Sequence, residues 1–302
     1  MAQDTVSVYL DGDMLVSARE GRHNYMNKLS QAFESAGARV VFRENTLLER
    51  IASAGRDGYS LFHMEEPFHD RALTTRRAYV YPFWRIEASA RRWEWEVAQT
   101  AFDPDAVDPE EAARFCRFWR RRLFGDLEGS REGFVYVPLQ GLLLDHRSFQ
   151  TMAPVEMLRR TAEADPHREI LVGLHPKERY LPEEHAALER LEAETPRLQI
   201  TDAAPEVLLA ACDYVVTQNS ALAFSGYFFA KPAVLFARID FHHIAANVAE
   251  LGVEDAVRAA RDALPPYERY IHWFLQQMSI NAGKEDAPAR ILAAVRRRGW
   301  KM

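Results

Sequence analysis

Short apolar runs alternate with helical patterns through the first third of the chain. Runs rich in β-branched and aromatic residues predict strands at 6–10, 39–42, 59–64 and 78–83. Apolar positions at helical spacing predict helices over 25–35 and 46–54, the first of which ends before Gly37. Strands that alternate with helices favour right-handed crossovers and a mostly parallel sheet. This part of the chain therefore predicts an α/β domain.

A helical stretch rich in Trp and Arg follows, over residues 85–124. It is interrupted near residues 103–109, where Asp108 can cap a second helix that begins with Pro109. We expect this helical pair to connect two domains. The next segment, 125–133, is polar and contains glycine, so the predicted domains are residues 1–125 and 126–302.

A second alternating series begins directly after this segment. Its predicted strands are 134–139, 170–174, 198–201, 214–217 and 233–236, and its predicted helices are 154–164, 183–194, 205–212 and 220–230. The pattern is typical of a doubly wound α/β domain. The tail predicts helices over 266–278 and 287–298 with no further strand, and we expect them to pack back across the domain boundary.

Composition agrees with two globular domains. The 302 residues are 48% hydrophobic and 27% charged. The 38 Lys and Arg against 44 Asp and Glu leave a net charge of -6, which argues against a nucleic-acid partner. Cys116 and Cys212 lie in apolar runs that predict buried side chains, not a disulfide framework or a zinc site. With no signal peptide pattern, and too short an apolar window over 221–237 for a spanning helix, we expect a cytoplasmic protein.

Polar side chains follow four strands of the second predicted domain. Because ligands bind beyond the carboxyl ends of parallel strands, these positions are the candidates for a binding site. They include amide, imidazole, hydroxyl, carboxylate and cationic groups: Gln140, Asp145, His175, Lys177, Glu178, Gln218, Asn219, Ser220, His242 and His243.

Structural alternatives exist for most of these residues. Asn219 and Ser220 can cap the following helix, or the helix N-terminus can bind phosphate. His175 can end a strand as a hydrogen-bonded histidine, although Lys177 beside it adds a charge suited to a phosphate oxygen. Asp145 can open a turn, and Gln140 can bond a loop carbonyl. For His242 and His243, packing is the preferred interpretation.

The first predicted domain has fewer candidates. Asp11, Asp13 and Glu44 follow strands, and loop solvation is the preferred interpretation for them. The adjacent Glu65 and Glu66 are candidate bases or nucleophiles, and the sequence does not choose between them.

Two basic stretches contain aromatic residues, over 114–122 and 296–301. Either could contact an anionic membrane surface. The preferred alternative is that arginine stems cover an interdomain face or belong to a solvated tail.

Several motifs together resemble a known family. They are Val137-Pro138-Leu139-Gln140 with Asp145, Leu174-His175-Pro176-Lys177-Glu178, Thr217-Gln218-Asn219-Ser220, Phe228-Phe229-Ala230-Lys231-Pro232 and Tyr270-Ile271-His272-Trp273. In order and spacing they resemble the bacterial capsular polysaccharide biosynthesis proteins related to the β-Kdo transferases. The resemblance covers residues 134–274. It implies two Rossmann-like lobes of the B-type glycosyltransferase architecture, with mostly parallel sheets.

The resemblance also implies a role for each matched residue. His175 and Lys177 would face the phosphates of a sugar donor on the second lobe, with His175 also counted as catalytic, and Asn219 and Ser220 would hold phosphate or base at a helix N-terminus. The remaining substrate-binding residues would be Glu178, Gln218 and His243. Gln140 and Asp145 would line the cleft, with Asp145 near the anomeric carbon and Glu65 or Glu66 supplied by the first, acceptor-side lobe. One departure is Ser225, which stands where many such enzymes place a ribose-binding Glu.

The function that the resemblance implies is metal-independent transfer of a sugar from a nucleotide donor, CMP-Kdo, to a capsule or other surface polysaccharide acceptor. No cofactor or metal is implied, and the partners would be the donor, a saccharide or glycolipid acceptor, and peripherally the inner membrane or an assembly complex. The alternatives are a nucleotide-sugar epimerase and a non-catalytic assembly subunit that binds a nucleotide or a glycan.

Overall fold

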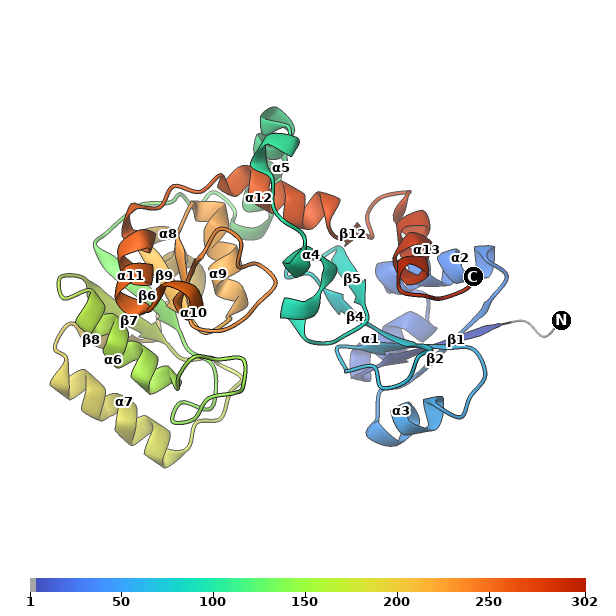
Figure 1. Cartoon of the computed structure of the whole chain (residues 1–302), viewed down its shortest axis with the longest axis horizontal. Helices are drawn as coiled ribbons and strands as arrows, with labels where there is room; N and C mark the ends of the chain where they lie inside the picture. Colours follow the sequence, from blue (N-terminus) through green and yellow to red (C-terminus); the bar gives the residue numbers. More distant parts are fainter. Residues whose placement is uncertain (1–3) are drawn as a thin grey trace. The chain divides into compact units, whose positions relative to one another are not determined.

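The computed structural model describes residues 4–302, which form two compact units (Figure 1). Unit 1 comprises the chain up to Thr100 together with Phe274–Met302, and unit 2 comprises Ala101–Trp273. These limits differ from the predicted boundary between residues 125 and 126. The helix that precedes this boundary packs against another helix of unit 2, and the C-terminal segment belongs to unit 1.

Unit 1 is built on a six-stranded sheet in the order β12-β5-β4-β3-β1-β2. Strands β1 to β4 are parallel, whereas β5 and β12 are antiparallel to their neighbours. The bounds are β1 Thr5–Leu10, β2 Arg39–Glu44, β3 Tyr59–His63, β4 Ala72–Arg77, β5 Phe83–Glu87 and β12 Ile280–Asn281.

Two helices from opposite ends of the sequence pack together in unit 1. Helix α2 (Asn24–Ser35) and helix α13 (Ala287–Arg297) lie side by side, as Figure 1 shows, and share one hydrophobic core. Each buries residues at helical spacing, such as Leu29 and Phe33 on α2 and Ile291 on α13. The C-terminal helix therefore returns to the first unit, as predicted. The other helices are α1 Gly12–Arg19, α3 Leu47–Ser53 and α4 Glu96–Gln99.

Three expectations for unit 1 are wrong. Most of the predicted strand at 78–83 is a turn between β4 and β5, which begins at Phe83, because Pro82 has no N–H to donate to a ladder. The helical pattern expected from residue 85 begins instead with strand β5, and the tail contributes strand β12, which pairs with β5. Helix α1 was not predicted, since its apolar positions are few.

Unit 2 contains a fully parallel sheet in the order β11-β10-β9-β6-β7-β8. The five predicted strands are all present, and the short β11 is additional. The bounds are β6 Phe134–Pro138, β7 Glu169–Gly173, β8 Leu198–Thr201, β9 Tyr214–Thr217, β10 Ala233–Leu235 and β11 Ala246–Asn247.

Helices surround this sheet and bury its apolar strands. The core contains residues of β6, β7 and β9 such as Val137, Val172 and Val216, packed against Leu158 and Leu188 of two covering helices. The helices are α5 Pro109–Phe124, α6 Pro154–Ala164, α7 Pro182–Glu194, α8 Pro205–Ala211, α9 Ala221–Gly226, α10 Val248–Leu251, α11 Val253–Asp262 and α12 Tyr267–His272. Both cysteines are free and buried, as predicted.

Candidate functional site

The strand order of unit 2 singles out one position on its sheet. Numbered along the chain from β6, the strands lie in the order 3-2-1-4-5-6, so the chain reverses its direction of winding between β6 and β9. In open α/β sheets, ligands bind beyond the carboxyl ends of the strands at this topological switch point. The relevant segments are therefore 139–153 after β6, 174–181 after β7 and 218–220 after β9, which we call the switch loops of unit 2.

Hydrogen bonds tie the ends of these strands together. The Thr217 hydroxyl at the end of β9 donates to the carbonyl oxygen of Pro138 at the end of β6, at 3.1 Å. The amide of Leu139 donates to the carbonyl oxygen of Gly173 at the end of β7, at 2.8 Å. The three strand ends are thus held in a fixed relation where the predicted binding residues begin.

A buried carboxylate fixes the loop after β6. Glu184 in the first turn of α7 is 5% exposed, and its two oxygens accept from the amides of Leu143, at 2.5 Å, and Leu181, at 2.8 Å. The Glu178 carboxylate also lies against this loop, since a methyl group on Gly141 would come within 2.6 Å of its Oε2. The loops after β6 and β7 therefore act as one structural element.

The His175 ring adopts a defined hydrogen-bonding state. Its Nδ1 accepts from the amide of Lys177 at 3.2 Å, so Nε2 carries the proton of the neutral ring. The amide of His175 itself donates to the hydroxyl of Tyr180 at 2.8 Å. The side chains of His175, Lys177 and Glu178 are exposed. Two N–H-bearing groups beyond the end of β7 are thus available to phosphate oxygens.

The segment after β9 caps a helix. The hydroxyl oxygen of Ser220 accepts from the amide of Leu222 at 3.3 Å, which confirms the capping interpretation. Gln218 is 3% exposed and donates from Nε2 to the carbonyl oxygen of Met152 at 2.9 Å, linking this segment to the loop after β6. Among residues 4–302 its Oε1 has no hydrogen-bond partner. Asn219 is buried beside it, and a phosphate-binding role for this segment stays a prediction.

Asp145 and His243 lie in different surroundings. Asp145 is 83% exposed and its Oδ1 accepts from the adjacent amide of His146 at 2.7 Å, the local bond of a turn-forming aspartate. Nδ1 of His243 is 3.0 Å from the hydroxyl of Tyr270, and its ring packs edge-on against Trp273. The packing interpretation therefore describes His243 well, whereas Asp145 is free to contact a ligand. Gln140, in the loop after β6, is half-buried.

Glu65 and Glu66 belong to unit 1, and each carboxylate has a partner there. Oε2 of Glu65 is 3.3 Å from the guanidinium of Arg50. Oε2 of Glu66 accepts from the amide of Ala90 at 2.7 Å and lies 3.3 Å from the hydroxyl of Ser89. Glu66 thus holds a loop in place, and the proposed catalytic role of either residue stays a prediction.

Unit 1 also contains a polar cluster that the sequence did not assign. Asp11, after β1, has its Oδ2 3.3 Å from Nδ1 of His63 at the end of β3, and it accepts from Nδ2 of Asn45, after β2, at 3.1 Å. The Asp11 side chain is 63% exposed, so it is solvated as expected, and it also has two polar partners that the sequence did not indicate. The available signal was that all three residues lie at or shortly after the ends of predicted strands.

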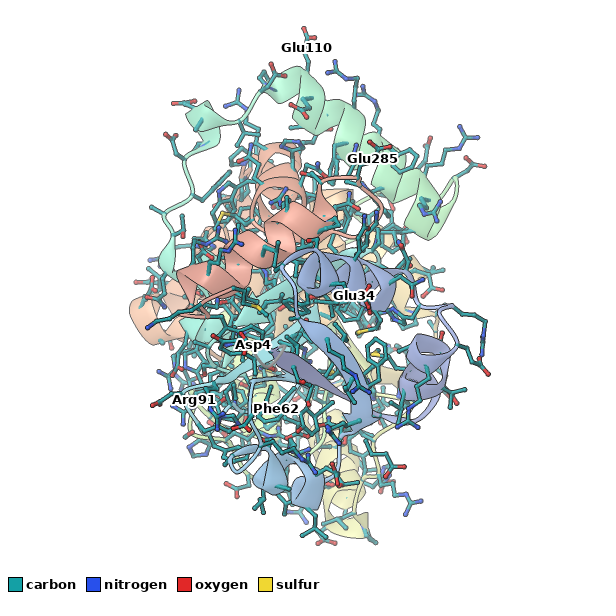
Figure 2. All side chains as sticks on the ribbon, turned by 90° about the vertical axis from the view of Figure 1, so that its right-hand side faces the viewer. Asp4, Glu34, Phe62, Arg91, Glu110 and Glu285 are labelled. Atoms are coloured by element: carbon teal, nitrogen blue, oxygen red, sulfur yellow. The ribbon has the colours of Figure 1, made fainter. Side chains whose placement is uncertain are left out.

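The two basic stretches have different roles in the structure. Trp300 is buried and stacks on Tyr59, and Arg298 pairs with the buried Glu87, so these two residues pack onto unit 1. The other residues of the C-terminal stretch, Arg296, Arg297, Gly299 and Lys301, are exposed. On α5 the side chains of Arg114, Arg117, Phe118 and Arg121 form an exposed stripe at helical spacing. Figure 2 shows Glu110, in the first turn of α5, pointing outward.

Residues 4–302 contain neither a helix that could span a membrane nor a group of potential metal ligands. No helix in this part of the chain is long and apolar enough to cross a bilayer. Within the same residues, no three His, Cys, Asp or Glu side chains are grouped closely enough to hold a metal ion. The predicted metal independence of the reaction remains a prediction.

Among solved structures, the chain is similar to Thermosulfurimonas dismutans KpsC, a beta Kdo 2,7 transferase, with 13% identity over 89% of each chain and a TM-score of 0.52. It is also similar to the beta Kdo 2,4 transferase of KpsC from the same organism, with 10% identity over 89% of this chain and 90% of that one and a TM-score of 0.43. S. aureus MnaA with UDP is 12% identical over 97% of this chain and 96% of that one, with a TM-score of 0.38. No protein-family model matches the chain, and no curated protein matches it.

The first of these structures supports an assignment of fold. Two Rossmann-like units, each with a mostly parallel six-stranded sheet, define the B-type glycosyltransferase fold, and this chain has that fold. The scores of the other two structures are too low to add to the argument. At this level of identity the similarity assigns the fold alone, and the activity has to be argued from the residues.

Proposed function

We propose that this protein is a glycosyltransferase that binds a nucleotide-activated sugar at the switch loops of unit 2. The observation that carries the proposal is the position of His175 and Lys177 beyond the end of β7, next to the switch point between β6 and β9. An ammonium group and an imidazole N–H suit the phosphate oxygens of a nucleotide sugar.

The chemistry of glycosyl transfer fits these groups. When the bond from the anomeric carbon to the phosphate oxygen breaks, negative charge develops on the departing phosphate, and positive charge develops on the sugar. Lys177 and His175 would stabilise the phosphate, while the exposed carboxylate of Asp145 would stabilise the oxocarbenium-like centre. Gln140, Asn219 and Ser220 would position the donor.

The finer identity of the substrates follows from the sequence resemblance. We propose a donor of the CMP-Kdo class and a surface saccharide or glycolipid as acceptor. A nucleotide-sugar epimerase would need the same donor site without an acceptor, and a non-catalytic subunit would bind the nucleotide without turnover. Analysis of the products separates the three: a new glycosidic bond, an epimerised sugar nucleotide or unchanged donor.

The first test is calorimetric titration of CMP, CDP, UDP, GDP and ADP into the full chain. We expect one nucleotide to bind selectively. Lys177→Ala or His175→Ala should lower the affinity for this nucleotide about tenfold or more, because a charge-assisted hydrogen bond contributes about 1.5–3 kcal/mol. Arg190→Ala, which removes an exposed cation of α7 outside the switch loops, is the matched control.

Two results would contradict the proposal. If none of the nucleotides bound, the switch loops of unit 2 would not be a donor site. Equal affinity of wild type, Lys177→Ala and His175→Ala would show that the nucleotide binds elsewhere. For the catalytic assignment, Asp145→Asn should bind the nucleotide normally and lose transfer by about a hundredfold.

A further inference from the structure

A cavity of about 220 Å³ lies in unit 1 beside the C-terminal helix α13. Its walls come from three segments of the chain: Glu96 of α4, the segment 277–280 that leads into β12, and one face of α13. All of these residues belong to unit 1. Pockets that hold drug-sized ligands measure about 300–1,000 Å³. This cavity therefore suits a smaller molecule, of the size of a single sugar.

The wall that α13 contributes is cationic. Arg290 and Arg297 both line the cavity, on one face of the helix, because their spacing corresponds to about two helical turns. The half-buried Arg290 donates from Nη1 to the carbonyl oxygen of Gln276, at 3.0 Å, and from Nη2 to that of Gln277, at 2.5 Å. These two bonds fix the guanidinium at the wall. A guanidinium has about five N–H donors, so others remain for an anion in the cavity.

The ion pairs beside the cavity leave an excess of positive charge. Oε2 of Glu96 lies 3.3 Å from Arg297 and 3.0 Å from Arg298, and Arg298 also pairs with the buried Glu87. Burial by itself would raise the pKa of Glu96, but the two arginines outweigh burial and hold this pKa below its ordinary value. Among residues 4–302, Arg290 has no carboxylate partner. Three arginines thus face two carboxylates, and the unpaired cation lies in the cavity wall.

Other groups in the wall are suited to hydroxyl groups. In the part of the chain that the structure describes, Oε1 of Glu96 accepts no hydrogen bond, and the exposed side-chain amide of Gln277 has no partner. A carboxylate oxygen can accept from a hydroxyl group, and an amide can donate to it or accept from it. Met278, Ile280 and Ala293 add an apolar part of the lining. The lining therefore matches a ligand with one anionic group, several hydroxyl groups and a small carbon skeleton.

The charged end of the cavity lies away from the edge at which open α/β sheets bind their substrates. Strand β5 runs antiparallel to β4, and Glu87 at the end of β5 pairs with Thr74. This end of β5 therefore points toward the amino ends of the parallel strands, whereas substrates bind beyond the carboxyl ends. The amide of Glu96 donates to Oε2 of Glu87 at 3.4 Å, which places Glu96 at this end. The cavity is thus a separate feature of unit 1.

We propose that this cavity is a binding site for a small hydroxylated anion, either a sugar phosphate or a sugar acid. The phosphate or carboxylate group binds Arg290 and Arg297, and a hydroxyl group donates to Oε1 of Glu96. Arginine suits both kinds of anion because its planar guanidinium presents paired N–H donors to two oxygens. The inference does not rest on the proposed function, since every residue that lines the cavity belongs to unit 1.

Calorimetric titration of the full chain with glucose 6-phosphate, gluconate and glucose tests the proposal. We expect at least one of the two anions to bind, and glucose, which lacks the anionic group, not to bind. The anion that binds more tightly identifies the ligand as a sugar phosphate or a sugar acid. Binding should shift the amide NMR signals of Met278, Ser279 and Ile280. Lys177→Ala, which alters the proposed donor site of unit 2, should bind the anion as wild type does, and loss of binding in this variant would place the anion in unit 2 and overturn the proposal.

Two variants locate the site. Ala293→Phe fills the cavity without removing a hydrogen-bonding side chain and should abolish binding of the anion. Ala289→Phe is the matched control, since Ala289 is an exposed alanine one turn earlier on α13 that does not line the cavity.

Arg297→Gln should lower the affinity for the anion about tenfold or more, the effect of one charge-assisted hydrogen bond, whereas Arg296→Gln, outside the lining, should not. Urea unfolding shows whether each variant is folded. The proposal is overturned if neither anion binds the wild type, or if Ala293→Phe and Arg297→Gln both bind the anion as tightly as the wild type does.

Discussion

Glu184 is expected to be the residue on which the geometry of the unit 2 switch loops depends most. Its buried carboxylate joins the loop after β6, through Leu143, to the N-terminus of α7, through Leu181. Substitution Glu184→Gln keeps the shape of the side chain and one acceptor oxygen. The amide nitrogen that replaces the second oxygen then faces a backbone N–H, so one charge-assisted bond is lost and a buried donor is left unsatisfied.

The expected cost is about 1.5–3 kcal/mol of unfolding free energy, the contribution of one hydrogen bond to a charged group. Urea unfolding of the full chain measures this loss, and hydrogen exchange of the Leu143 and Leu181 amides localises it. Because the loop after β6 carries Gln140 and Asp145, nucleotide affinity should fall together with amide protection. This local effect distinguishes loss of the bridge from a general loss of stability.

Glu183→Gln is the matched control, since Glu183 is the exposed neighbour in the same helical turn. It should change the free energy of unfolding by no more than about 0.5 kcal/mol. The reasoning would be refuted if Glu184→Gln were as stable as Glu183→Gln and the two amides exchanged at wild-type rates. In that case the carboxylate would not be what holds the loop.

Two further predictions concern other parts of unit 2. Arg168 pairs with the buried Asp165, at 3.1 Å, and Asp213, at 2.7 Å, so Arg168→Met should destabilise the protein by about 3–5 kcal/mol in urea unfolding. Arg159→Met, which breaks an exposed pair, should cost about 1 kcal/mol or less, and an equal effect of the two variants would contradict the prediction. The exposed stripe of α5, which contains Arg117, Arg121 and the 59% exposed Phe118, should bind phosphatidylglycerol vesicles in a salt-dependent manner. Neutralising both arginines, with Arg117→Gln and Arg121→Gln, should weaken co-sedimentation about 30-fold, at about 1 kcal/mol per arginine, and unchanged binding would assign the contact to another surface.

The sequence predicted those elements whose residues are uniformly apolar or regularly amphipathic. The five main strands of unit 2 and helices such as α2 and α7 were confirmed because their burial follows from local periodicity. Strand β4 was missed because it is built from Thr and Arg. Its Thr74 and Thr75 are buried, and their hydroxyls donate to the carbonyl oxygens of Phe62 and Arg85. Such a strand looks polar until its neighbours are known.

The candidate site divides in the same way. The sequence by itself located the polar residues after β6, β7 and β9, because a strand end can be recognised from the local change from apolar to polar residues. The tertiary structure decided which of these residues are structural, such as Ser220 as a helix cap and Glu66 as a loop support. Each of these roles depends on a partner that the local pattern does not specify.

The pairing of Asp11 with His63 was decided by the tertiary structure alone. The two residues are 52 positions apart and meet because β3 lies next to β1. Periodicity along the chain determines which segments become strands, since burial of one face or both depends on nearby residues. The order of the strands in the sheet depends on how the crossovers pack the helices, which is a property of the whole unit. The sequence thus determined the elements and their polar ends, and the strand order determined which of those ends came together.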